Sequence, residues 1–134
     1  AAHDAVVTGS VIIKENGHYY NRLFWVRPDG ELSYYDKRHL FTLAGEQHTY
    51  TPGLARLVEE WRGWHICPLV CYDLRFPVWS RNQPGAPYDL ILYVANWPAV
   101  RRTAWMTLLR ARARPLYTSP SPRDRTRSRM PSSA

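Results

Sequence analysis

Cys71 is the residue of this 134-residue chain whose type and position best suit nucleophilic chemistry. It follows an apolar, strand-like run at residues 66–70 and precedes a predicted helix at residues 74–82. Open α/β sheets place ligands at the carboxyl ends of their strands, and a helix N-terminus favours a thiolate. The position therefore suits a nucleophile, although a lone cysteine is more often a small, buried, unreactive thiol. Cys67 lies inside the apolar run and fits that alternative better.

A lysine, a glutamate and two histidines are further candidates for the same chemistry. Lys37 lies at the end of a predicted strand, next to a loop. A lysine beside a thiolate would lower the pKa of the thiol and bind the oxyanion of a tetrahedral intermediate, although a lysine beside an arginine is usually surface charge. Glu46 is equally open to a functional or a surface role. His39 and His48 could serve a Cys-His mechanism, but we favour structural hydrogen bonds for both.

Turn signals divide the first part of the chain into strands that must position these residues. Asn16-Gly17 and the run 28–30 (Pro-Asp-Gly) each follow a strand-like run, and Arg62-Gly63 lies between two more. We therefore predict a three-stranded meander followed by a hairpin. The predicted strands are residues 6–13, 18–26, 31–36, 54–61 and 64–70.

The second part of the chain adds another strand and a helix. Residues 89–94 form a nearly continuous apolar run, of the kind that is buried on both faces of a sheet. Residues 99–113 place Trp105, Leu108 and Leu109 on one side and arginines on the other, which indicates an amphipathic helix. Strands mixed with covering helices predict an α/β layered domain.

The net charge of +7 is concentrated near one end of the chain. Residues 1–100 contain nine basic and ten acidic residues, whereas residues 101–134 contain nine arginines and one aspartate. A basic groove usually draws cations from several parts of a chain, so nucleic-acid binding is a minor hypothesis. No apolar run reaches the roughly 18 residues of a membrane span. Two cysteines and no visible export signal favour the cytoplasm.

Three separate motifs resemble the nitrilase, or carbon-nitrogen hydrolase, superfamily. They are residues 35–41 (YDKRHLF), 68–77 (PLVCYDLRFP) and 92–98 (LYVANWP). Within the superfamily they are most similar to the bacterial omega-amidase branch. The resemblance covers about residues 5–113 in unbroken order, and the agreement of three motifs makes coincidence a poor explanation.

The resemblance implies a four-layer αββα sandwich, present here as a partial domain over residues 1–114. It also implies that Cys71 is the nucleophile, that Lys37 and the backbone N–H of Tyr72 hold the oxyanion, and that Glu46 orients the site. In the implied mechanism a glutamate base takes the thiol proton, the thiolate attacks an amide carbonyl, ammonia leaves and water hydrolyses the thioester. Neither a metal nor an organic cofactor is implied.

The implied substrates are small amides, namely ω-amides of 2-oxo dicarboxylic acids, and the implied assembly of the intact protein is a homodimer. Because such a substrate carries a carboxylate, a cation is expected near the pocket. Arg75, four residues after the nucleophile, is the candidate, and an ion pair with Asp73 or Glu46 is the alternative. Asn96 and Trp97 follow a predicted strand and are expected to line the pocket, although Trp97 could equally belong to the core.

The sequence departs from the family in two places. The family's general-base glutamate comes from an upstream segment without a counterpart in residues 1–134, since Glu15 and Glu31 lie in turns. With an ordinary cysteine pKa of about 8.5 the thiol would stay protonated, so we expect this chain alone to be inactive. The alternative is a catalytically dead module that dimerises or binds a partner through the same sandwich.

The second departure is residues 115–134, which are rich in proline, serine and arginine and match no part of the family. They contain too few large apolar side chains to offset the entropy of ordering. We predict a disordered tail that is not native to the family, resembling translated adapter sequence; a genuine flexible tail is the alternative.

Overall fold

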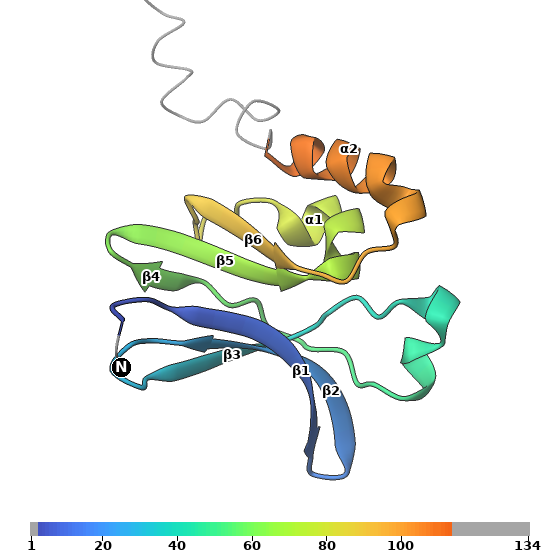
Figure 1. Ribbon diagram of the computed structural model, residues 1–134, viewed down its shortest axis with the longest axis horizontal. Helices are drawn as coiled ribbons and strands as arrows, with labels where there is room; N and C mark the ends of the chain where they lie inside the picture. The colour runs from blue at the N-terminus through green and yellow to red at the C-terminus, as the bar shows by residue number, and fades with distance from the viewer. Residues whose placement is uncertain (1–2, 114–134) are drawn as a thin grey trace, which may run out of the picture.

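Two three-stranded sheets lie face to face, and helices cover the outer side of one of them (Figure 1). This arrangement comes from a computed structural model, which describes residues 3–113. The first sheet is antiparallel, with the order β1 (Val7–Glu15), β2 (His18–Val26) and β3 (Leu32–Asp36). The predicted meander is confirmed. Its first strand runs further than the predicted residues 6–13, because the register pairs Glu15 with His18 directly across the Asn-Gly turn.

The second sheet joins a hairpin to a parallel strand. β4 (Glu59–Trp61) and β5 (Trp64–Val70) are antiparallel, and β6 (Leu90–Val94) pairs with β5 in parallel. The predicted hairpin at Arg62-Gly63 is confirmed, with both turn residues at positive φ. The strand before it is shorter than the predicted residues 54–61. There Arg56 donates hydrogen bonds to three backbone carbonyl groups instead of continuing the sheet.

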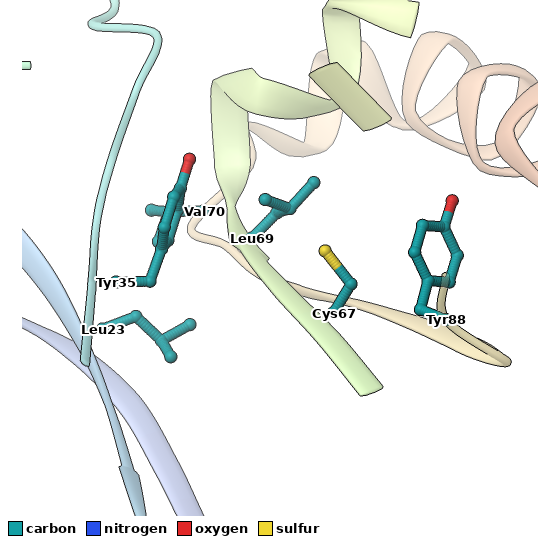
Figure 2. Packing of buried hydrophobic residues seen from close by; sticks show 6 residues of the cluster. All are labelled: Leu23, Tyr35, Cys67, Leu69, Val70 and Tyr88. Carbon is teal, nitrogen blue, oxygen red and sulfur yellow. The ribbon is translucent and has the colours of Figure 1, made fainter. Parts of the chain in front are cut away.

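β5 is the strand at the centre of the structure. Its residues from Ile66 to Val70 are all buried. Figure 2 shows Cys67 and Leu69 on the side of β5 where Tyr88 lies, away from Leu23 and Tyr35 of the first sheet. The strand is therefore covered on both faces, by the first sheet on one side and by the helical layer on the other.

β6 is less buried than its sequence predicts. Leu90 is 47% exposed and the other residues of the strand are only partly buried. The prediction that residues 89–94 are buried on both faces is wrong for the described part of the chain. The physical reason is position, because β6 is an edge strand of its sheet there and has a neighbour on one side only.

The helix predicted for residues 74–82 is replaced by two shorter pieces. A 3₁₀ helix spans Cys71–Arg75 and α1 spans Pro77–Ser80. Phe76 between them is extended, at φ −110° and ψ 92°. Proline lacks an N–H and disfavours helical geometry in the residue before it, so Pro77 ends one helix and begins the next.

The last predicted helix is confirmed with tighter limits. A 3₁₀ helix at Ala99–Arg101 leads into α2 (Arg102–Arg112), within the predicted range 99–113. α1 and α2 lie on the same side of the second sheet (Figure 1). Among residues 3–113 the order helix, sheet, sheet makes up three of the four layers of the expected αββα sandwich.

The predicted tail at 115–134 lies outside the described residues, as does the boundary proposed before it. None of the helices in the described part of the chain is long and apolar enough to cross a membrane.

Candidate active site

Cys71 lies directly after β5, at the point where the buried strand turns into a 3₁₀ helix. Its φ is +46°, a left-handed conformation that side-chain-bearing residues rarely adopt and that is found at strained functional turns. The residue is partly buried and lines a cavity of about 330 Å³. The thiol donates towards the carbonyl oxygen of Asn96, at 3.8 Å. Cys67, by contrast, is fully buried in the core.

Asp73 holds this turn in place from within the core. It is completely buried, and its Oδ2 accepts hydrogen bonds from the Tyr35 hydroxyl at 2.8 Å and from the Val70 N–H at 3.1 Å. Its Oδ1 lies 3.0 Å from the backbone N of His39 and 2.8 Å from Nδ1 of the same residue. A buried carboxylate with donors on both oxygens is a strong anchor. Asp73 therefore joins the turn after β5 to the segment after β3.

His39 and His48 both form structural contacts. The His39 ring stacks on Phe76, with ring centres 3.6 Å apart, while its Nδ1 faces Asp73. His48 is exposed and shares a 3.0 Å hydrogen bond with the Gln47 side chain. These contacts agree with the structural hydrogen bonds that the sequence favours over a Cys-His mechanism.

Lys37 and Glu46 form a close ion pair beside the cysteine. Lys37 is only 2% exposed, and its Nζ lies 2.7 Å from Oε2 of Glu46. The same oxygen accepts the backbone N–H of Phe41 at 2.7 Å. The backbone of Lys37 is fixed as well, since its N–H donates to Asn21 and its carbonyl oxygen accepts from the Gly53 N–H. The loop between β3 and Glu46 thus folds back so that the two charges meet.

Burial has a larger effect than nearby charges on the pKa of the Cys71 thiol. Removal from water raises the pKa of the Cys71 thiol above its ordinary value, the Lys37 cation lowers that pKa, and the Glu46 carboxylate raises it again. From the sequence, a lysine beside the thiolate is expected to lower the pKa of the thiol. Lys37 has this effect, but burial outweighs it and the net direction is upward. For Cys67 burial raises the pKa to about 11.

The cavity at Cys71 is built from aromatic and apolar surface with a few polar groups. Phe41, Leu43, Tyr72, Trp97 and Pro98 form its apolar walls. The remaining lining residues are Cys71, Arg75, Asn96 and Arg101. The predicted pocket residues Arg75, Asn96 and Trp97 therefore come together around the thiol, together with Tyr72, whose backbone N–H is the expected oxyanion donor. Lys37 and Glu46 are not among the lining residues.

Arg75 and Trp97 contact each other rather than the groups that the sequence offered as alternatives. The guanidinium carbon of Arg75 lies 5.5 Å from the Trp97 ring centre. Within the described residues Arg75 forms no ion pair, because Asp73 is bound to His39 and Glu46 to Lys37. Trp97 is partly buried at the cavity and does not belong to the central core.

Sequence reasoning missed Arg101. It is the last residue of the 3₁₀ helix before α2, and its guanidinium carbon lies 5.9 Å from the Phe41 ring centre. The available signal was its place three residues after the Asn-Trp-Pro motif, in a turn that leads away from a strand's carboxyl end. We find no group of three His, Cys, Asp or Glu side chains in the described part of the chain that could hold a metal ion.

Together these groups are suited to a reaction in which a thiol attacks a small molecule. A sulfur faces a cavity of suitable size, with an ammonium and a carboxylate beside it and two guanidinium groups in the walls.

A protein family and several characterised proteins are similar in sequence to this chain. The family described as carbon-nitrogen hydrolase matches residues 1–114. The chain is 60% identical over 110 residues to Omega-amidase YafV of Yersinia enterocolitica, across 82% of this chain and 42% of that relative. It is 34% identical over 109 residues to the 2-oxoglutaramate amidase of Bacillus subtilis (strain 168), across 81% of this chain and 42% of that protein.

A solved structure is similar to this chain in both fold and sequence. XC1258 from Xanthomonas campestris, a CN-hydrolase superfamily protein with an arsenic adduct in its active site, matches with a TM-score of 0.78 and 54% identity. The match covers 82% of this chain and 44% of that one. The chain therefore spans less than half the length of the relatives it matches.

Proposed function

This chain belongs to the carbon-nitrogen hydrolase family, and on that premise we propose that it forms part of an enzyme that uses Cys71 to hydrolyse a small amide. The observation that carries the proposal is the position of the thiol. It opens into a cavity from a strained turn, next to the ion pair of Lys37 and Glu46. This combination suits covalent catalysis at a carbonyl group.

The proposed reaction has two halves that share one covalent intermediate. Sγ of Cys71 attacks the amide carbon, and the C–N bond then breaks so that ammonia leaves with the proton taken from the thiol. Water adds to the resulting thioester, the C–S bond breaks, and the acid and the free thiol are released. In both halves the negative oxygen is held by the Lys37 ammonium and the backbone N–H of Tyr72. Tyr72 is the second residue of its 3₁₀ helix, where an N–H has no partner inside the helix.

Glu46 has a positioning role in this proposal. It binds both Lys37 and the Phe41 N–H through one oxygen, and so it fixes the ammonium relative to the sulfur.

The reaction therefore requires a base that residues 3–113 do not supply. The raised pKa of Cys71 keeps the thiol protonated at neutral pH, and the two carboxylates whose charges act on it, Glu46 and Asp73, are bound to other donors. Glu15 and Glu31 pair with arginines, Arg22 and Arg27. We expect the 134 residues alone to show little or no amidase activity.

For the substrate we propose ω-amides of 2-oxo dicarboxylic acids. The names of two relatives, an omega-amidase and a 2-oxoglutaramate amidase, support this class. A cavity of about 330 Å³ matches small molecules, and Arg75 gives its wall the positive charge that a carboxylate needs. Asn96 and Trp97 complete the wall beside it. The family resemblance further suggests a cytoplasmic homodimer for the intact protein.

A chimera tests this function. The 110 matched residues of the Yersinia enterocolitica relative are exchanged for those of this chain, and ammonia release from 2-oxoglutaramate is measured. We expect activity in the chimera, and a loss of about 10³-fold or more in kcat on Cys71→Ala, as for removal of a covalent nucleophile. Cys67→Ala is the matched control, with activity kept. A folded chimera that releases no ammonia from any ω-amide, beside an active parent, contradicts the proposal.

A further inference from the structure

The cavity at Cys71 contains two guanidinium groups from different elements. Arg75 ends the 3₁₀ helix that begins at Cys71, and Arg101 ends the 3₁₀ helix that follows β6. Among the described residues that line the cavity, none is acidic. The wall around the thiol therefore carries positive charge only.

Aromatic side chains hold both cations at this wall. The Arg75 guanidinium lies over Trp97 and the Arg101 guanidinium over Phe41, at 5.5 Å and 5.9 Å from the ring centres. Trp97 also donates its Nε1–H to the Arg101 carbonyl oxygen at 3.0 Å. One tryptophan thus fixes the backbone of one arginine and contacts the side chain of the other. Cation–π contacts orient a guanidinium and leave its N–H groups free to bind an anion.

Two other arginines in the described residues differ from Arg75 and Arg101, because they form ion pairs with carboxylates. Arg22 binds Asp36 and Glu15, and Arg27 binds Glu59. Neither Arg75 nor Arg101 has a carboxylate partner in that part of the chain. Two cations without partners next to an apolar cavity favour an anionic ligand.

We propose that Arg101 is a second anion-binding residue and that, with Arg75, it selects amides whose far end is a carboxylate, above all a 2-oxo carboxylate. This inference rests on the proposed function and assigns a specificity-determining residue to it. A guanidinium fork matches the two oxygens of one carboxylate. A 2-oxo acid offers a third oxygen, and a second guanidinium in the wall of the same cavity can bind it while the amide end meets Cys71.

Two alkylating reagents of nearly equal size test the charge preference without requiring turnover. Iodoacetate and iodoacetamide both form an S–C bond to a thiolate and release iodide, and they differ in charge. The rate constants for Cys71 in the full 134-residue chain are measured by mass spectrometry of its peptide. The ratio of the two rates is then compared with that of a free cysteine peptide. The thiolate fraction multiplies both rates equally, so changes in thiol pKa cancel in the ratio.

We expect the iodoacetate to iodoacetamide ratio at Cys71 to exceed that of the free peptide, and to fall at high salt because solvent-accessible charges are screened. Arg101→Gln is expected to lower the ratio about fivefold, as for the loss of one solvent-accessible charge contact at short range. Arg101→Lys should retain part of the preference. Arg110→Gln, an exposed arginine on α2 that does not line the cavity, is the matched control and should leave the ratio unchanged.

The outcomes separate this inference from the proposed function. An equal ratio in the parent chain and in Arg101→Gln, or a ratio no higher than that of the free peptide, overturns the role of Arg101 while a fast-reacting Cys71 still supports the nucleophile. A Cys71 that reacts no faster than Cys67 overturns both. The salt dependence is measured on the unsubstituted chain, so the inference remains testable even if a variant folds poorly.

Discussion

At the scale of single residues, two opposing effects act on the pKa of the Cys71 thiol. Burial at the end of β5 keeps Cys71 protonated, and the nearby Lys37 opposes that effect without overcoming it. The strained turn explains why the thiol nevertheless faces a cavity, because a left-handed residue after a strand points its side chain out of the regular pleat. A buried thiol of this kind needs a base to become a nucleophile, which is consistent with a family mechanism that uses one.

The balance of charges around Cys71 predicts shifts of opposite sign in two variants. Lys37→Gln removes the cation that lowers the thiol pKa, so the pH midpoint of Cys71 alkylation by iodoacetamide should rise. Glu46→Gln removes a negative charge that raises the same pKa, so the midpoint should fall. Lys14→Gln, an exposed lysine on β1, is the control. Two shifts in the same direction would contradict this electrostatic account.

At the scale of elements, the site depends on two connections that leave strands of the two facing sheets and meet. The turn after β5 carries Cys71 and the segment after β3 carries Lys37, and Asp73 joins them from the core. Gly53 supports the second segment from the other side, where its N–H binds the Lys37 carbonyl oxygen at 3.0 Å. The chain approaches so closely there that a side chain on Gly53 has no room.

Gly53→Ala is therefore expected to destabilise the fold. A Cβ at this position would lie 2.0 Å from the carbonyl oxygen of Asp36, and backbone cannot move as a flexible side chain does. Overpacking of this kind costs about 1–3 kcal/mol in the free energy of unfolding, which urea denaturation measures. Gly85→Ala is the matched control, because no atom lies within 4 Å of its Cβ, and its effect should stay within about 0.5 kcal/mol. Equal midpoints for the two variants would contradict the close approach.

At the scale of the whole molecule, the two sheets expose edges and apolar side chains. In the described part β1 and β3 are the outer strands of the first sheet, and β4 and β6 those of the second. Leu32 of β3 is 53% exposed and Leu90 of β6 is 47% exposed. Unpaired edges with exposed apolar residues favour association with other copies of a chain.

We expect the 134-residue chain alone to associate increasingly as its concentration rises, as size-exclusion chromatography with light scattering would show. The double variant Leu32→Lys and Leu90→Lys places charges on two edge strands and should shift the population towards the monomer. Val100→Lys is the control, because Val100 is 93% exposed but lies outside the strands. Equal association in the parent and the double variant would show that these edges are not responsible.

The sequence by itself determined the strands, the turns and the motifs that carry the family resemblance. Alternation of apolar residues and the chemistry of Asn-Gly and Arg-Gly turns are local properties, so β1, β2, β3 and β5 follow from them closely, whereas β4 is much shorter than predicted. Pro77, which splits the predicted helix, was equally visible in the sequence. The roles proposed for Cys71, Lys37 and Glu46 came from the resemblance, since spacing alone left each of them open.

Only the tertiary structure decided the rest, namely the Lys37–Glu46 ion pair, the second arginine at the cavity, the partial exposure of β6 and the net direction of the Cys71 pKa. Each of these depends on which surfaces cover which others and on distances between segments far apart in the chain. Burial and electrostatics depend on that three-dimensional surrounding, and a local pattern of residue types does not contain it.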